Sequence, residues 1–285
     1  MSLRWFGLFL IAVLSLVVWL EVVRQTPGGD LSVSFLDVGQ GDAIFIEAPN
    51  GNQILIDGGF GRQVLRELGG VMPFYDRSLD LVIATHSDTD HLGGLPFVLE
   101  RFAVSSVMTN GEPGDNEASV SFAEAVRAEK VPELTARAGV KVELDRGVEL
   151  TILYPDRKTD LDVDSNTMSI VALLRYGETE FLLTGDAPAA VEDQLVQTYT
   201  ANLRAEVLKL GHHGSDTSSS DYFLAATKPD LAIISAGRDN RYGHPHQVVL
   251  DRLDRLSIPY FSTADVGTIT FQSDGYTVTC VECSR

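Results

Sequence analysis

One pattern occurs twice along the chain, and this repetition limits the folds open to it. In each half, two apolar strand-like segments joined by a tight turn end on an aspartate, Asp57 in the first half and Asp186 in the second. A helical stretch follows, and an apolar strand then runs into histidine, at His86 and at His212. Each half would supply one sheet with its helices outside. We therefore predict an α/β fold in which two sheets pack face to face as a four-layer αββα sandwich.

The composition indicates a globular protein with a large core. Apolar residues make up 44% of the 285 residues and charged residues 22%, which excludes a disordered, collagen-like or coiled-coil chain. The 22 Lys and Arg against 40 Asp and Glu give a net charge of -18, and so acidic a surface repels nucleic acid unless one site locally reverses the sign. Any phosphate-binding function must therefore be focused at one place.

The chain has two cysteines, Cys280 and Cys283, which are too few for a disulfide scaffold or a four-cysteine zinc site. They fall in a predicted terminal strand, where residues three apart face opposite sides, so a disulfide between these two would need a local turn. We expect them to lie in an unstructured tail without a function.

The N-terminal segment differs from the rest of the chain. Sixteen consecutive uncharged residues run from Trp5 to Leu20, and with their flanks they would form a helix of about 31 Å, long enough to span a bilayer. We predict a membrane anchor over 1–24, a linker over 25–30 and one domain over 31–285. The alternative is a cleaved signal peptide and secretion, although no small-x-small cleavage site follows the apolar run. The flanking charges place the body outside the cytoplasm of a single-pass membrane protein.

The six histidines fall into three short clusters, and the first cluster carries the strongest motif. His86, Asp88, Asp90 and His91 follow directly after an apolar strand. Two imidazoles and two carboxylates within six residues exceed what one tetrahedral ion would take from so tight a turn, so the motif predicts two ions. An acidic turn at the start of a helix, the alternative explanation, accounts for Asp90 but for neither histidine.

This motif resembles the His-x-Asp-x-Asp-His variant of the metallo-beta-lactamase superfamily, in which Asp88 replaces the more usual second histidine. Further motifs resemble, in the same order, the C-terminal domain of ComEC-type DNA-uptake proteins; they lie at 36–42, 55–59, 183–186, 210–215 and 242–245. The similarity runs from about residue 31 to residue 272. The many-helix channel of those proteins has no counterpart here, so we expect no transport by this chain.

The resemblance implies two divalent ions held by ligands from both halves. The expected ligands are His86, Asp88, Asp90, His91, Asp186 and His213, with His212 as the alternative to His213. Asp186 would bridge the ions, and Asp57 would orient a metal-bound histidine. The carboxylate at position 88 makes the site richer in oxygen, so Mn²⁺ competes with Zn²⁺. The candidate catalytic residues are Asp90, His212 as a proton donor, and His244 as a substrate contact.

The usual superfamily pattern has a further histidine between the first motif and the bridging aspartate, and this chain has none between His91 and His212. Residues 165–167, Ser-Asn-Thr, lie in that interval. They could supply oxygen ligands or bind substrate, or they could form an exposed turn.

Two adjacent ions can ionise a bound water and stabilise both the attacking and the leaving oxygen, so hydrolysis is the expected reaction. We predict a phosphodiesterase or nuclease of the ComEC type, with a phosphodiester substrate that could be single-stranded DNA. The alternatives are a hydrolase of small phosphodiesters such as phosphocholine esters, and a metal-binding domain without turnover. Nothing in the sequence predicts a protein partner.

Overall fold

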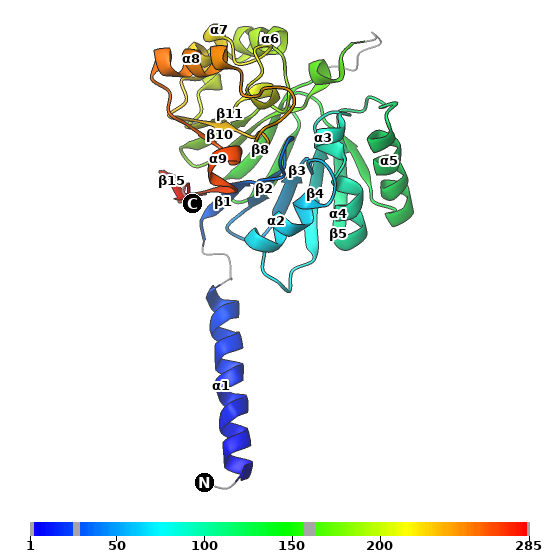
Figure 1. Cartoon of the computed structure of the whole chain (residues 1–285), viewed down its shortest axis with the longest axis vertical. Coiled ribbons are helices and arrows are strands. Elements are labelled where there is room, and N and C mark those ends of the chain that lie inside the picture. The colour runs from blue at the N-terminus through cyan, green and yellow to red at the C-terminus, as the bar shows by residue number, and fades with distance from the viewer. Residues whose placement is uncertain (1–2, 25–28, 157–162, 284–285) are drawn as a thin grey trace.

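The computed structural model describes residues 3–24, 29–156 and 163–283, and from Leu31 onward the described chain forms two sheets (Figure 1). The first sheet has the order β15-β14-β1-β2-β3-β4-β5-β6. Its strands are β1 (Leu31–Phe35), β2 (Ile44–Glu47), β3 (Gln53–Ile56), β4 (Ser78–Ala84), β5 (Ala103–Thr109), β6 (Glu133–Thr135), β14 (Ile269–Ser273) and β15 (Val278–Glu282). The second sheet has the order β13-β12-β11-β10-β9-β8-β7. Its strands are β7 (Lys141–Asp145), β8 (Val148–Tyr154), β9 (Val171–Tyr176), β10 (Thr179–Leu183), β11 (Val207–Lys209), β12 (Leu231–Ile234) and β13 (Tyr260–Ser262).

The two sheets repeat one pairing scheme. β2 and β3 form an antiparallel hairpin, and β4 then adds in parallel beside β3. In the second sheet, β9 and β10 form the antiparallel hairpin and β11 adds in parallel beside β10. Because the carboxyl ends of neighbouring parallel strands meet at one edge, each sheet brings its hairpin aspartate beside the strand that leads into histidine. The repeated pattern predicted from the sequence is therefore present in the fold.

Helices cover the outer face of each sheet. On the first sheet lie α2 (Gln63–Val71), α3 (Thr89–Leu92), α4 (Leu95–Arg101) and α5 (Glu117–Glu129). On the second lie α6 (Ala189–Tyr199), α7 (Asp221–Thr227) and α8 (Gln247–Leu256). The shorter elements are α9 (Thr263–Val266) and the 3₁₀ turns η1 (Ser165–Met168), η2 (Thr200–Leu203) and η3 (Gly211–Gly214). The predicted two-sheet α/β sandwich is confirmed, and Figure 1 shows the helical layers on its outer faces.

The strands are apolar on both faces because both faces are covered. In β2, Ile44 and Ile46 point into the core between the sheets, whereas Phe45 packs under the helices of the first sheet. Side-chain caps mark the start of two of these helices: Asn116 accepts a hydrogen bond from the Ser119 amide at the start of α5, and Ser220 accepts one from the Phe223 amide at the start of α7.

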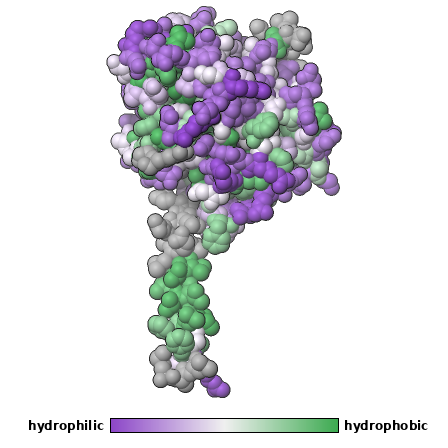
Figure 2. Space-filling view, in the orientation of Figure 1, coloured by the Kyte–Doolittle hydropathy of each residue, from purple (hydrophilic) through white to green (hydrophobic). Residues whose placement is uncertain are grey.

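The N-terminal helix α1 (Leu3–Arg24) lies outside the three hydrophobic clusters, none of which includes a described residue before Leu31. Between Trp5 and Trp19 its large apolar side chains are exposed, with Trp5 at 67% and Phe9 at 62%, and Figure 2 shows an apolar surface along this part of the helix. Over the described residues, however, no helix combines the length and the apolar character needed to cross a membrane. The predicted membrane-spanning helix over 1–24 is therefore not supported. The predicted linker falls largely outside the described residues.

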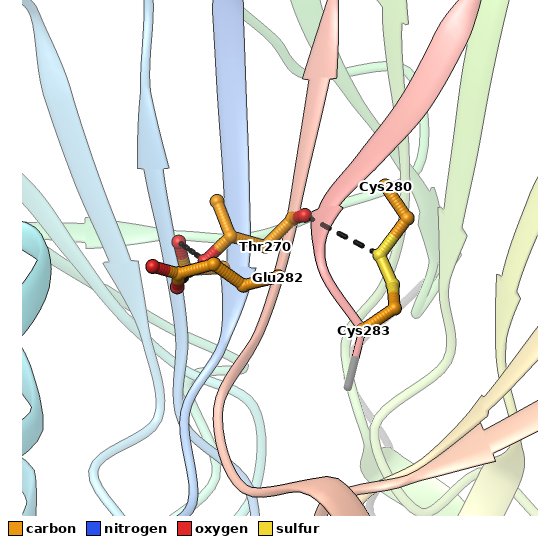
Figure 3. Close-up of a disulfide and its surroundings, with 5 residues drawn as sticks. Thr270, Cys280, Glu282 and Cys283 are labelled. Atoms are coloured by element: carbon orange, nitrogen blue, oxygen red, sulfur yellow. Dashed lines mark hydrogen bonds between the residues drawn. A yellow bond between two sulfur atoms is a disulfide. The ribbon is translucent and has the colours of Figure 1, made fainter. Parts of the chain in front are cut away.

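The C-terminal segment contains the predicted terminal strand, but its cysteines differ from the prediction. It forms β15, which pairs antiparallel with β14, and Cys280 and Cys283 form a disulfide with their Cα atoms 6.0 Å apart (Figure 3). The pairing register shifts between Thr270 and Phe271, whose partners are Glu282 and Cys280, so one extra residue bulges from β15. A bulge breaks the alternation of faces that made a disulfide within a strand improbable, and the expectation of an unstructured tail was wrong.

Candidate metal centre

The predicted site residues come from loops at one edge of the two sheets. Four of the buried side chains, Asp42, His91, Asp186 and His213, each offer one ligand atom within 4.8 Å of the others. Asp186 Oδ2 lies 3.3 Å from His91 Nε2 and 3.2 Å from His213 Nε2. Both of these ring nitrogens are buried and have no hydrogen-bond partner among the described residues. Buried polar atoms are normally hydrogen-bonded. Two unpaired nitrogens that point toward the same carboxylate are therefore the arrangement expected of ligands to a metal ion.

Hydrogen bonds on the far side of each ring hold these histidines in the orientation that a ligand needs. His91 Nδ1 lies 2.7 Å from Asp57 Oδ2, and Asp57 also accepts hydrogen bonds from the amide and the hydroxyl of Thr85. His213 Nδ1 donates to the Ser235 carbonyl at 2.9 Å. In both rings the Nδ1 contact leaves Nε2 free for a metal, and Asp57 makes the orienting contact expected of it.

Asp42 and Asp90 lie on opposite sides of the His213 ring. Asp90 Oδ2 is 3.4 Å from His213 Nε2, on the side of the free nitrogens. Asp42 Oδ1 is 3.4 Å from His213 Nδ1, the nitrogen that already donates to Ser235, and the other oxygen of Asp42 pairs with Lys209. Although Asp42 is the more deeply buried carboxylate, the geometry makes Asp90 the better ligand and Asp42 a support behind the ring.

Lys209 is the functional residue that the sequence reasoning missed. It is fully buried at the end of β11, where its Nζ pairs with Asp42, donates to the Gly185 carbonyl at 2.7 Å and lies 3.5 Å from Asp186 Oδ1. A single charge within an otherwise apolar strand, Val207 to Leu210, was the available signal. Charged side chains are almost never fully buried unless paired, so this lysine implied a carboxylate inside the fold.

His86 and Asp88 form a second group beside the first. His86 is buried, its Nε2 has no hydrogen-bond partner among the described residues, and this atom lies 3.8 Å from Asp88 Oδ2. The ring centroids of His86 and His91 are only 4.1 Å apart. Ser165, in η1, donates to Asp88 Oδ1 at 2.5 Å, and the neighbouring Asn166 Oδ1 is buried without a partner there. The turn at 165–167 is therefore part of this group rather than an exposed turn.

His212 and His244 lie at the mouth of the cluster. His212 and His213 both have the left-handed backbone conformation, with φ of 49° and 56°, which non-glycine residues rarely adopt in succession. This turn buries the His213 ring and leaves the His212 ring partly exposed, with its Nε2 3.9 Å from Asp186 Oδ2. The His244 ring lies 5.4 Å from that of His212, and its Nδ1 is buried without a partner in the described chain.

The pKa values of the cluster follow from burial and from the mixture of charges. Burial and the neighbouring His91 lower the pKa of His86 to about 3. Burial opposes protonation of His91 and His213 as well, but the neighbouring carboxylates together outweigh it and hold the pKa of both rings above the ordinary value: Asp186 with Asp57 at His91, and Asp186 with Asp42 at His213. Without a metal, protons bound to these two rings offset the negative charge of Asp186. Because a ligating imidazole must give up its proton, metal binding here should strengthen as pH rises.

Comparison with known proteins agrees with this geometry. Residues 36–238 match the sequence profile of the Metallo-beta-lactamase superfamily. The chain belongs to this superfamily. It is 33% identical to ComE operon protein 3 of Bacillus subtilis, over 90% of this chain and 35% of that protein. It is 32% identical to Competence protein ComA of Neisseria gonorrhoeae, over 87% of this chain and 33% of that protein.

The chain thus spans about a third of the length of these curated relatives. Among solved structures, the metallo-beta-lactamase fold protein YhfI of Bacillus subtilis superposes with a TM-score of 0.57 at 12% identity, over 86% of this chain and all of that one. At that identity the likeness shows the fold alone. The family and the resemblance to competence proteins predicted from the motifs are confirmed, and the superfamily consists generally of metal-dependent hydrolases.

Proposed function

We propose that this chain is a binuclear-metal phosphodiesterase. The observation that carries the proposal is the convergence of three buried imidazole nitrogens, on His86, His91 and His213, that have no hydrogen-bond partner among the described residues. Three carboxylates surround them. The negative charges of these carboxylates and of one hydroxide would balance two divalent ions, so the ligands and ions together would carry no net charge. An anionic substrate could then approach a protein whose net charge is -18.

The ligands divide between two ions according to the distances. His86 and Asp88 would hold the first ion, and Asp90, His91 and His213 the second. Asp186 Oδ2 lies within 3.3 Å of the free nitrogens of His91 and His213, so it would join the ligands of the second ion. The resemblance to the superfamily further implies that Asp186 would also bind the first ion and so bridge the two. When bound, the ion pair would lower the pKa of a water and neutralise charge on the phosphodiester. Three carboxylates and three imidazoles suit Mn²⁺ as well as Zn²⁺.

The remaining polar side chains at the mouth would handle protons and substrate. Asp90 is partly exposed, so its carboxylate could accept a hydrogen bond from the attacking water while it binds the ion. His212 Nε2 lies 3.9 Å from Asp186 Oδ2 and would donate a proton to the leaving oxygen. His244, one ring farther out, would contact the substrate.

Two features bear on the substrate class. The resemblance of the motifs to ComEC-type DNA-uptake proteins supports single-stranded DNA, whereas the net charge of -18 favours a smaller phosphodiester such as a phosphocholine ester. The test is a hydrolysis panel with added Mn²⁺ or Zn²⁺ on single-stranded DNA, duplex DNA, RNA and bis-p-nitrophenyl phosphate, with Asp186→Ala as the control. Cleavage of DNA that is lost in Asp186→Ala would support a nuclease. Cleavage of the small diester alone would favour the alternative, and no cleavage of any substrate by metal-loaded protein would refute a phosphodiesterase.

We further propose that α1 attaches the protein to a membrane. The support is the exposed apolar surface of α1, since an apolar helix that packs against no core is stable in contact with lipid rather than water. Flotation of the full chain with lipid vesicles, compared with a chain beginning at Asp30, tests the attachment. Equal recovery of both in the unbound fraction would refute it.

A further inference from the structure

A row of planar side chains leads from the metal centre to the surface. The His244 ring lies 6.1 Å from that of His213, at an interplanar angle of 33°. The Tyr242 ring stacks on His244 with centroids 5.7 Å apart and an interplanar angle of 20°. Arg241 places its guanidinium 4.8 Å from the centre of the Tyr242 ring and donates to the Tyr242 hydroxyl at 2.6 Å. The row therefore joins a candidate metal ligand to an aromatic ring and a cation.

The loop that carries this row is held firmly by its own hydrogen bonds. The Asn240 side-chain oxygen accepts from the Tyr242 and His244 amides at 3.1 and 3.0 Å, and its amide nitrogen donates to the carbonyls of Gly237 and His244. His246 Nε2 lies 3.2 Å from the Tyr242 carbonyl oxygen. A ring fixed in this way loses little conformational freedom when a second planar group stacks on it.

Tyr242 is nevertheless exposed. Its relative exposure is 48%, so packing against His244 does not account for an aromatic residue at this position. Arg241 is exposed too, and it makes no ion pair with a carboxylate in the described part of the chain, so its charge is available beside the ring. In a chain with 40 acidic residues, a cation at the outer end of the row that leads to the metal centre, with Asp90 as its acidic neighbour, gives a polyanion a local point of attraction.

We propose that Tyr242 and Arg241 form a subsite for a single-stranded nucleic acid whose phosphodiester lies at the metal centre: an unpaired nucleobase stacks on the exposed Arg241 guanidinium, which lies over the Tyr242 ring. The proposal rests on the proposed phosphodiesterase function and names its substrate class. Stacking on aromatic rings and guanidinium planes is how proteins hold unpaired bases, and the bases of a duplex are not available for it. A quaternary ammonium such as choline also binds aromatic rings, but the Arg241 charge repels it.

The test compares a single-stranded oligonucleotide with an abasic oligomer of the same length and charge. Both carry phosphorothioate linkages to resist hydrolysis, and both are titrated with the full chain in Mn²⁺, with binding followed by fluorescence anisotropy. We expect Tyr242→Ala to weaken binding of the base-containing oligomer about tenfold and to leave the abasic oligomer unaffected, since stacking of one base contributes roughly 1–3 kcal/mol. Tyr242→Phe should bind as the parent does. Arg241→Ala should weaken binding of both oligomers.

The matched control is Tyr276→Ala, which removes a tyrosine that is 75% exposed in the turn between β14 and β15. It should change neither affinity, and metal content should be unchanged in every variant. Equal affinities of Tyr242→Ala and the parent, or an equal loss for both oligomers, would overturn the subsite even if the protein hydrolyses DNA. Conversely, a base-dependent loss in a protein that hydrolyses no phosphodiester would uphold the subsite and reject the phosphodiesterase.

Discussion

Replacing the buried Lys209 with methionine should separate the stability of the fold from its affinity for metal. Methionine keeps the length and apolar stem of lysine but removes the charge. Lys209→Met leaves the Asp42 carboxylate buried without its ammonium partner and removes one of the hydrogen bonds to the Gly185 carbonyl. Breaking a buried pair by removing one partner costs about 3–5 kcal/mol, a large part of the roughly 5–15 kcal/mol that stabilises a typical domain. The metal-free variant should therefore be severely destabilised.

The Lys209 charge stabilises the metal-free fold but should weaken the binding of a metal ion. Lys209 Nζ lies 3.5 Å from Asp186 Oδ1, a distance at which unit charges interact by about 4–5 kcal/mol at an effective dielectric constant of 20. That attraction competes with a cation for Asp186, and the ammonium also repels the cation directly. We expect metal to bind Lys209→Met at least about tenfold more tightly than the parent, which corresponds to about 1.4 kcal/mol. Saturating metal should therefore restore about 1.4 kcal/mol of the unfolding free energy that the substitution removes.

Urea unfolding in EDTA and in saturating Mn²⁺ measures both stabilities, and calorimetric titration measures the affinity. Lys141→Met is the matched control, because Lys141 pairs with Glu149 at 2.9 Å on the surface. It should lose less than about 1 kcal/mol, equally with and without metal. Weaker metal binding by Lys209→Met, or an equal loss of stability in both conditions, would refute the electrostatic reasoning and make Lys209 a residue that positions Asp186.

Three further predictions concern the metal pair, a buried acid and the N-terminal segment. Elemental analysis should find about two ions per chain in the parent, about one in Asp88→Ala and fewer than one in Asp186→Ala; two ions in Asp186→Ala would contradict bridging. Burial raises the pKa of Glu192 from 4.5 to about 7, so the folded state binds the proton more tightly. The unfolding free energy of the parent relative to Glu192→Gln should then fall by roughly 3 kcal/mol as pH rises from below 4.5 to above 7, and a flat difference would refute the shift. A chain beginning at Asp30 should keep the parent's melting temperature and metal content, because no hydrophobic cluster of the described chain includes an earlier residue; aggregation of this chain would contradict the prediction.

The sequence revealed those parts of the site that follow from strand ends. Asp57, His86 and Asp186 each come within three residues of the end of an apolar strand, and parallel pairing brings such positions to one edge. The repeated pattern was therefore enough to predict two sheets and a shared site. It could not distinguish His212 from His213, because the difference depends on two consecutive left-handed residues that turn only the His213 ring inward.

Residues that act across long sequence distances were not predictable in this way. Asp42 and Lys209 are separated by most of the chain, and only the packing of one sheet on the other shows that they pair. The disulfide depended on a bulge in β15, and a bulge leaves no mark in an alternating pattern. The turn at Ser165 contacts Asp88 only because the second sheet brings it over the first motif.

The proposed ligands belong to both sheets, so a bound ion would also act as a crosslink. Asp90 and His91 follow β4 in the first sheet, whereas Asp186 and His213 follow strands of the second, about 100 residues farther along the chain. An ion that joins such distant points restrains the open chain much as a disulfide would. Loss of the ion should therefore let the sheets part at this edge first, and a protease added with a chelator should cut the loops that carry the ligands before it reaches the strands.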